Sequence, residues 1–514
     1  MREVGVKSNP VHVQIALCIA VFLVPFMGSS LNLALPLIAG DFTMSAFSLT
    51  FIVSGYLVGT SMFQMPAARV SDILGRRRMF LLGLSLFGLF TLLSGFAWSG
   101  TALIVFRFLS GVGSAFVFAT NMAILTSVFP KEKRGAALGV NTSVVYFSVA
   151  IGPFLGGLLA HHFGWRSIIY VTTGVTVLAI IAAVVTIKDE WVLAKGEPYD
   201  TAGAGLYSIA VAALVFGFSL LPLAVGWILV LVAAVGTFLF IRTENRIPYP
   251  MLKVHIFKEN RHFRLASLSA MINYSASFAI GFILSLYLQY VIGMTPDRAG
   301  LVLIAQPLTQ TLLAPVGGWL SDRVNPSILT TGGMGAITVG LFFLSYLTPT
   351  TSMWYVVAIL VLVGIGFAMF SPPNANIIMS SVSRRDSGLA SATTGTARQI
   401  GQSMSIAMTS LIIHHYMGRN ELTRETAEMF LPAMQTGFLI FAAICLVGCY
   451  TSASKLLYGG HREQWRHQSV RTTARTDGDG VDDGADSIPG NGSDSFGDDG
   501  SDNAAGDASG GTST

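Results

Sequence analysis

Long apolar segments separated by short polar loops make up most of the chain, from about residue 12 to residue 453. A helix needs about 20 apolar residues to cross a bilayer, whereas a membrane β-barrel shows alternating segments of about ten residues. The pattern therefore predicts an all-α integral membrane protein with 14 transmembrane helices. The predicted spans are residues 12–35, 47–68, 79–98, 101–124, 137–160, 167–187, 204–222, 226–241, 265–291, 299–319, 328–347, 353–372, 389–413 and 431–453.

Two of the apolar runs are too long for a single span and must contain a turn. Residues 201–241 hold no charged side chain over 41 positions, and residues 324–383 hold none over 60. Proline and glycine interrupt the first run at Pro222–Gly226, and Pro349–Ser352 interrupts the second. Because these residues favour turns, we interpret each run as a helical hairpin.

The composition also indicates a membrane protein. Only 11% of the residues are charged, against about 25% in an average soluble domain, and a soluble surface needs more polar groups than that. The three cysteines lie inside apolar runs and form no disulfide framework or metal-ligand pattern. The sequence contains no phosphate-binding loop or nucleophile motif at a plausible depth. We therefore expect neither an enzyme nor a resident cofactor or metal.

The placement of Lys and Arg predicts which ends of the spans face the cell interior. With the N-terminus inside, 25 of the 31 Lys and Arg residues fall in inside segments and four in outside loops, while Arg107 and Arg398 lie within spans. A wrong number of spans would move basic loops to the outside and remove this excess of Lys and Arg on the inside. We therefore expect a multi-pass protein of the cell membrane with both termini in the cytoplasm, and a retained first span rather than a cleaved signal peptide.

The chain changes character after the last span. Residues 456–475 are basic and should lie beside the inner leaflet, where anionic lipid attracts them. Residues 476–514 hold ten Asp and no Lys or Arg, a charge of −10, whereas the rest of the chain carries +14. This last segment is rich in Gly, Ser and Asp and has almost nothing to bury, so we expect a disordered acidic tail.

Two similar loops follow the second and the tenth predicted spans, both on the inside. The first, residues 68–78, contains Asp72, then Gly75 and three arginines, and the second, residues 317–323, ends in Ser-Asp-Arg. A Gly permits a tight turn, and the dipole of the next helix favours an Asp near its start. Matching loops in the two halves indicate an internal repeat; a plain basic loop is the alternative. The candidate gating residues are Asp72, Gly75, Arg76, Arg77, Asp322 and Arg323.

These loops resemble the signature of the major facilitator superfamily, G-x-L-A-D-R-x-G-R-[RK], with Ala68 in place of the first Gly and Ile73 in place of the first Arg. The fifth predicted span resembles the superfamily's antiporter motif, G-x-x-x-G-P-x-x-G-G, with Ser in place of the first Gly. Its small residues recur at every fourth position and favour close helix packing, and its proline can kink the helix. Ordinary packing is the alternative. The motif residues are Ser148, Gly152, Pro153, Gly156 and Gly157.

The two extra spans favour the fourteen-span drug:proton antiporter type within that superfamily, and residues 32–36, 200–203, 250–257 and 398–401 resemble stretches of that branch. The resemblance implies two six-helix bundles with a central two-helix hairpin. The N-terminal bundle would span residues 11–187 and the C-terminal bundle residues 263–455. The linker, residues 188–262, would contain the extra transmembrane hairpin at 204–241.

The resemblance also implies a function. Transporters of this type move small amphipathic or drug-like molecules out of the cell by alternating access, in exchange for protons, so a small-molecule substrate and the lipid bilayer are the expected partners. We expect no nucleic acid and a monomer. The gating loops would lock the cytoplasmic side in the outward-open state, and the fifth span would act as a pivot. The alternatives are an uptake symporter or uniporter of a neutral metabolite, and a non-transporting membrane sensor, which an added soluble domain would favour.

Charged side chains within the spans are rare and of one sign. No predicted span contains an acidic residue, and Met27 stands where this branch usually has one. A buried carboxylate is the usual proton carrier, so the scaffold is better supported than the proton coupling. Arg107 and Arg398 lie within spans, where a charge marks a functional site by default. A structural cation bonded to backbone carbonyls is the alternative.

Uncharged polar residues within the spans are candidates for a central cavity. Each of them could line a pocket or tie two helices together. Together they would form a neutral, hydrogen-bonding cavity with many aromatic neighbours, which suits amphipathic or neutral solutes better than a strongly cationic drug. The candidates are Asn32, Gln64, Asn121, Asn141, Tyr146, Asn273, Tyr274, Gln306, Gln310, Asn374 and Gln402.

Two histidine pairs, His161-His162 and His414-His415, end the fifth and thirteenth predicted spans on the outside. Histidine titrates near physiological pH, so these pairs could sense or relay protons. Paired interfacial residues that flank a span are the more frequent case.

Deleting residues 476–514 should leave transport intact, because a segment with almost nothing to bury contributes no packing to the spans. The measurement is the transport rate in cells, normalised to the amount of protein in the membrane. Loss of transport at normal membrane expression would contradict the interpretation of this segment as a dispensable tail.

Overall fold

The computed structural model describes residues 8–130, 134–221, 223–247, 250–252, 254–321, 323–382, 387–418 and 426–457. Helices dominate these residues, and their backbone groups bond within each helix, as a chain in lipid requires. The helices are α1 (Pro10–Phe42), α2 (Ala46–Leu74), α3 (Arg76–Gly95), α4 (Gly100–Val128), α5 (Arg134–Phe163), α6 (Arg166–Thr186), α7 (Thr201–Ser219), α8 (Ala224–Glu244), α9 (Val254–Glu259), α10 (Arg261–Ser277), α11 (Ala279–Leu286), η2 (Tyr287–Val291), α12 (Pro296–Leu303), α13 (Ala305–Ser321), α14 (Pro326–Leu344), α15 (Met353–Ser380), α16 (Ser387–Met417) and α17 (Ala427–Leu457).

The helices match the predicted spans. In the part of the chain that the structure describes, 13 helical stretches are long and apolar enough to cross a membrane. The remaining predicted span, residues 389–413, lies within the 31-residue helix α16, whose many Ser, Thr and Gln side chains make it more polar. Predicted span 265–291 is built from α10, α11 and the π-helical turn η2. The expected all-α membrane fold is confirmed, whereas the predicted tail, residues 476–514, lies outside the described residues.

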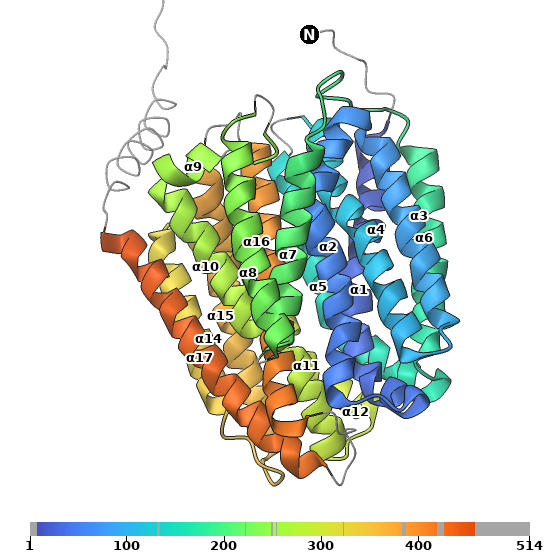
Figure 1. The fold of residues 1–514 in the computed structure, drawn as a ribbon, viewed down its shortest axis with the longest axis vertical. Coiled ribbons are helices and arrows are strands. Elements are labelled where there is room, and N and C mark those ends of the chain that lie inside the picture. Colours follow the sequence, from blue (N-terminus) through green and yellow to red (C-terminus); the bar gives the residue numbers. More distant parts are fainter. Residues whose placement is uncertain are drawn as a thin grey trace, which may run out of the picture. The chain divides into compact units, whose positions relative to one another are not determined.

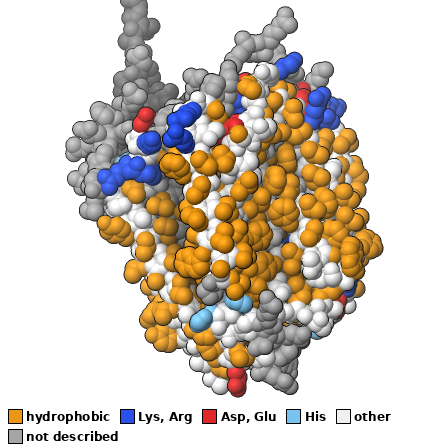
Figure 2. All heavy atoms as spheres, viewed as in Figure 1, with side chains coloured by type: hydrophobic (Ala, Val, Ile, Leu, Met, Phe, Trp, Pro, Cys, Tyr) orange, Lys and Arg blue, Asp and Glu red, His pale blue; other side chains and the backbone are white. Residues whose placement is uncertain are grey.

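The helices run side by side along the long axis of the body that they form (Figure 1). Hydrophobic side chains cover its middle, and Lys and Arg gather at the end where α1 begins (Figure 2). We call this the basic end. The chain after α6 lies at this end, because the backbone N–H of Ser8, just before α1, donates to Asp189 (3.0 Å). The α2–α3 turn lies there too, because the side chain of Arg77 donates to the carbonyl of Ile187, directly after α6. An apolar belt with basic residues at one end is the surface expected of a chain in a bilayer.

Glycines let helix backbones approach one another closely in both halves of the chain. A Cβ atom on Gly111 of α4 would collide with the backbone carbonyl of Tyr56 on α2. Helices α14 and α15 meet in a reciprocal way, since a Cβ on Gly333 would lie 2.6 Å from the carbonyl oxygen of Gly366, and one on Gly366 would lie 2.7 Å from that of Gly333. Lipid is as apolar as leucine, so packing of this kind drives association between transmembrane helices.

The central hairpin, α7 and α8, is attached through α7. The hydroxyl of Tyr207 on α7 donates to the carbonyl of Ser61 on α2 (2.8 Å), and Val215 packs between Val58 of α2 and Ala407 of α16. Thus α7 contacts one helix from each predicted bundle. Helix α8 packs on α7 and leaves large apolar side chains exposed, as a lipid-facing helix does; they include Trp227, Ile228, Leu231 and Phe238.

Replacing Gly111 by Ala should lower the thermal stability of the purified protein by several degrees, because the new methyl group forces α2 and α4 apart at a cost of about 1–3 kcal/mol. Gly174→Ala on α6 is the matched control, since a Cβ there meets nothing within 4 Å. The measurement is the fraction of protein in detergent that stays monodisperse after heating. Equal stability of the two variants would contradict the close α2–α4 packing.

Candidate functional site

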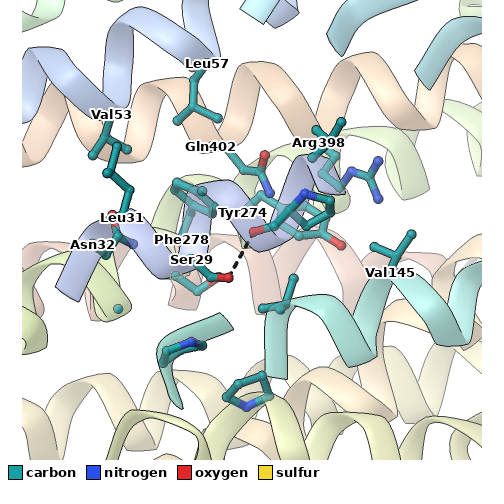
Figure 3. A pocket seen from close by; sticks show the side chains of 18 of the residues that line it. Ser29, Leu31, Asn32, Val53, Leu57, Val145, Tyr274, Phe278, Arg398 and Gln402 are labelled. Carbon is teal, nitrogen blue, oxygen red and sulfur yellow. Dashed lines mark hydrogen bonds between the residues drawn. The ribbon is translucent and has the colours of Figure 1, made fainter. Parts of the chain in front are cut away.

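A cavity of about 230 Å³ lies midway along the helices. Its walls come from α1, α2, α4 and α5 of the first predicted bundle, and from α10 to α13, α15 and α16 of the second. Figure 3 shows Asn32, Tyr274, Phe278, Arg398 and Gln402 around this space. The two halves of the chain therefore contribute jointly to one site.

Six of the eleven polar candidates line this cavity, and they come from five different helices. All six are amides or phenols, which can both donate and accept hydrogen bonds. They are Asn32, Tyr146, Tyr274, Gln306, Gln310 and Gln402.

The other five candidates lie away from the cavity wall. The amide of Asn121 on α4 donates to the carbonyl of Leu17 on α1 (3.0 Å), and that of Asn374 on α15 donates to Ala266 on α10 (3.1 Å). These two side chains tie helices together, which is the alternative that the sequence left open. The remaining three are buried between helices; they are Gln64, Asn141 and Asn273.

Both intramembrane arginines line the cavity. Arg107 is only 2% exposed, and its guanidinium carbon lies 4.4 Å from the centre of the Tyr56 ring. Arg398 lies 5.7 Å from the centre of the Phe118 ring. Cation–π contacts of this kind partly offset the loss of water around a guanidinium. Tyr56 and Phe118 are lining residues that sequence reasoning missed, because an aromatic residue within a span usually signals packing.

Hydrogen bonds join the two predicted bundles at the end opposite the basic end. They lie just beyond the cavity wall and connect α1 with α11 and η2, and α2 with α16. A weaker contact of 3.8 Å joins His161 on α5 to the carboxylate of Asp297 on α12. Ser285 donates a hydrogen bond to the carbonyl of Asn32 (2.7 Å), Gln289 donates one to the carbonyl of Leu33 (3.2 Å), and Thr50 donates one to the hydroxyl of Ser410 (2.8 Å).

The first gating loop turns at Gly75, whose φ of +115° suits glycine. Asp72 accepts a hydrogen bond from Arg76, four residues later (2.9 Å). The backbone N–H of Arg77 donates to the carboxylate of Glu190 (2.9 Å). These contacts fasten the loop to the chain that follows α6, and Glu190 is a partner that the sequence motif does not include.

Further contacts of this loop stay within the first half of the chain and the linker. The guanidinium of Arg76 donates to the hydroxyl of Ser127 at the end of α4 (3.0 Å), and Arg69 forms an ion pair with Glu197 (2.6 Å). In the second gating loop, Arg323 lies 3.9 Å from the centre of the Trp319 ring. Asp322 lies outside the described residues.

The antiporter-type motif places α5 against helices of both halves. The hydroxyl of Ser30 on α1 donates to the carbonyl of Gly152 (2.9 Å), and a Cβ on Gly156 would lie 2.5 Å from the Cα of Ser30. A Cβ on Gly157 would collide with the carbonyl of Pro296 on α12. Helix α5 therefore packs closely on α1, with only small serine side chains between them, and meets the backbone of α12 directly.

The other two motif residues have different positions. Pro153 lines the cavity, and its carbonyl would collide with a Cβ on Gly300 of α12. Ser148 is fully buried and bonds to the carbonyl of Val145 in its own helix (2.8 Å).

A buried carboxylate lies at the basic end, outside the predicted spans, in which the sequence analysis found no acidic residue. Glu244, the last residue of α8, is 3% exposed and accepts from the backbone N–H of Leu252 (3.0 Å). Asp200 caps the adjacent start of α7 by accepting from Gly203 (2.8 Å). The hairpin thus closes at its base with two carboxylates.

Comparisons with known proteins agree with this arrangement. The family model described as Major Facilitator Superfamily matches residues 17–241 and 266–476. The multidrug resistance protein Stp of Mycobacterium tuberculosis is 30% identical over 406 residues, which cover 78% of this chain and 75% of Stp. The tetracenomycin C resistance and export protein of Streptomyces glaucescens is 29% identical over 446 residues, covering 83% and 80%.

One further relative and one solved structure of similar fold are also informative. The riboflavin transporter RibZ of Clostridioides difficile is 24% identical over 441 residues, which cover 85% of this chain and 95% of RibZ. A crystal structure of a bacterial homologue of the human lysosomal transporter Spinster, in an inward-facing and occupied conformation, superposes with a TM-score of 0.63 at 15% identity and covers 87% of this chain and 97% of that one. The chain therefore belongs to the Major Facilitator Superfamily of multi-pass membrane transporters, not enzymes.

Proposed function

We propose that this secondary transporter exports small amphipathic molecules from the cell by alternating access, as a fourteen-span drug:proton antiporter. The observation that carries the proposal is the mid-depth cavity whose wall comes from both halves of the chain, because a site between two rocking bundles can face each side of the membrane in turn. The relatives named for multidrug resistance and for tetracenomycin C export support the direction of transport.

The contacts around the cavity suggest how the two halves move. The bonds between α1 and α11 and between α2 and α16 have to break before the cavity opens at the end opposite the basic end. Helix α5 stays in close contact with α12 through Gly157 and Gly300, which suits a pivot. The loop at Asp72 is fastened to α4 and to the linker, so it moves with the first half.

Proton exchange, which we propose as the driving reaction, has to use groups outside the cavity wall. Among the described residues no acidic side chain lines the cavity. Two carboxylates elsewhere are the candidates that we select: Asp297, which lies 3.8 Å from His161 across the α5–α12 contact, and the buried Glu244 at the basic end. Asp297 joins α12 to α5, and Glu244 joins the end of α8 to the backbone of Leu252 in the linker, so protonation at either place would alter that contact.

An uptake symporter or uniporter is the second candidate function. The relative named as a riboflavin transporter supports it, and so does the lack of an acidic side chain among the cavity residues that the structure describes. A growth and accumulation screen across drugs and metabolites, with riboflavin included, would separate the two: export makes cells lacking the protein accumulate the solute, whereas uptake makes them take up less of it.

Transport by proteoliposomes should respond to an imposed pH gradient if export is coupled to protons. The solute that the growth screen identifies would be measured with a gradient, without one, and with the gradient reversed. We expect the rate to rise at least several-fold when protons flow against the solute. Equal rates in all three conditions would exclude proton coupling and leave the uniporter.

Asp72→Asn should slow turnover about tenfold while changing solute affinity less than twofold, because Asp72 is not part of the cavity wall and its carboxylate holds Arg76 in place (2.8 Å). Arg78→Gln is the matched control, since the Arg78 side chain is 74% exposed and lies 3.7 Å from Glu190, and such surface pairs contribute little. The measurements are the transport rate and the equilibrium binding of the same solute. An unchanged rate in Asp72→Asn would remove the gating role.

A further inference from the structure

We infer that the central cavity selects organic anions with a planar aromatic body, in preference to neutral or cationic molecules of the same shape. The inference rests on the proposed transport of small amphipathic molecules and names their charge class. It comes from the balance of charge, the hydrogen-bond donors and the size of the cavity described above.

The charge of the cavity wall is positive. Arg107 and Arg398 both contribute to it, and among the described residues the wall contains no Asp or Glu. Neither arginine forms an ion pair with a carboxylate in that part of the chain. A guanidinium keeps its proton in proteins, so both charges are permanent. A cation that enters this space meets like charge and no counter-ion.

Arg107 has unused donors. Its side chain makes no hydrogen bond to any residue within the described ranges, and its Nε and Nη1 atoms are buried without a partner. The contact with the Tyr56 ring leaves the edge of the guanidinium unpaired. A buried charge that lacks a partner is unfavourable, and a carboxylate or sulfonate that accepts two N–H groups at once is the best-matched partner for a guanidinium.

The remaining lining residues favour a flat aromatic body. Amide and phenol groups supply donors, with Gln399, which the sequence analysis did not select, added to the predicted set. Aromatic rings offer faces for stacking, and the Tyr274 and Phe367 rings lie 6.2 Å apart. The aromatic lining residues are Tyr56, Phe118, Tyr146, Tyr274, Phe278 and Phe367.

The volume of the cavity limits the size of the solute. The space is about 230 Å³, and a cavity of about 150 Å³ holds one benzene molecule. A two-ring aromatic acid therefore fits, with its acidic group directed at an arginine. Larger solutes would need the halves to separate.

The test uses three naphthalene probes that differ in charge: naphthalene-2-carboxylate, naphthalene-2-carboxamide and naphthalen-2-ylmethylammonium. Binding to the full-length protein in lipid nanodiscs is measured by equilibrium dialysis, and binding to empty nanodiscs is subtracted. We expect the carboxylate to bind at least tenfold more tightly than the amide and the ammonium. Equal or tighter binding of the ammonium, or no saturable binding of the carboxylate, would overturn the inference.

Variants test whether the positive charge of the cavity wall is responsible. Arg398→Gln should weaken carboxylate binding at least fivefold and change amide binding less than twofold, whereas Arg242→Gln, at an exposed position on α8, should change neither. Arg107→Lys, which keeps the charge, should retain the carboxylate preference. Because the three probes are compared on each variant, a general loss of folding weakens all of them alike; that pattern in a monodisperse Arg398→Gln sample would count against the inference.

The outcome can be separated from that of the proposed transport. Binding of the carboxylate without its movement across a proteoliposome membrane would contradict the transport of such solutes and leave the anion site standing. Movement of the ammonium probe without carboxylate binding would support transport and overturn the anion site.

Discussion

Close approach of helix backbones at glycine positions is the interaction on which the rest of this structure depends. In a bilayer, apolar burial does little to hold helices together, because lipid competes for the same surfaces. Contacts such as that of Gly111 with the backbone of Tyr56, and that between Gly333 and Gly366, fix the helices within each half. With the halves assembled in this way, the space between them remains as one cavity at mid-depth.

Close backbone contact at glycine positions also occurs between the two halves, where it allows movement. Gly157 and Gly300 bring α5 and α12 together without side chains in between, and a smooth backbone contact can turn or slide without breaking side-chain packing. Hydrogen bonds from Ser285 and Thr50 supplement it. Such bonds are individually modest, so they can be exchanged for others during a transport cycle. The contact between the two halves can therefore stabilise one state of the transporter and still break when the transporter changes state.

The spans could be predicted from the sequence because hydrophobicity over about 20 residues is a strong local signal. The interruption of one span into α10, α11 and η2 could not, since a π-helical turn has no clear sequence signal. Polar residues could be located within the apolar spans, but their roles could not be predicted from the sequence. Asn32 lines the cavity, whereas Asn121 ties α4 to α1, and the difference depends on which face of the helix meets which neighbour.

Partners that are distant in sequence were the least predictable part of the site. Glu190 binds the loop at Arg77 from 113 residues away, and Tyr56 reaches Arg107 from another helix. Each pairing follows from the packing of whole helices, which no local pattern encodes. The arginines themselves could be found, because a charge within a span is rare, but the sequence did not show that both would line the same cavity, and the expected cavity was neutral.

Two permanent positive charges in a cavity that faces alternate sides would make the carrier sensitive to voltage. One elementary charge that crosses 100 mV changes its energy by about 2.3 kcal/mol, and Arg107 and Arg398 would each cross part of the field as the cavity changes sides. In a cell with a negative interior, the empty carrier would be drawn towards the state that faces the cytoplasm. Loading an anion there would cancel part of the charge and weaken that bias. The membrane potential would then return the empty carrier to its loading side.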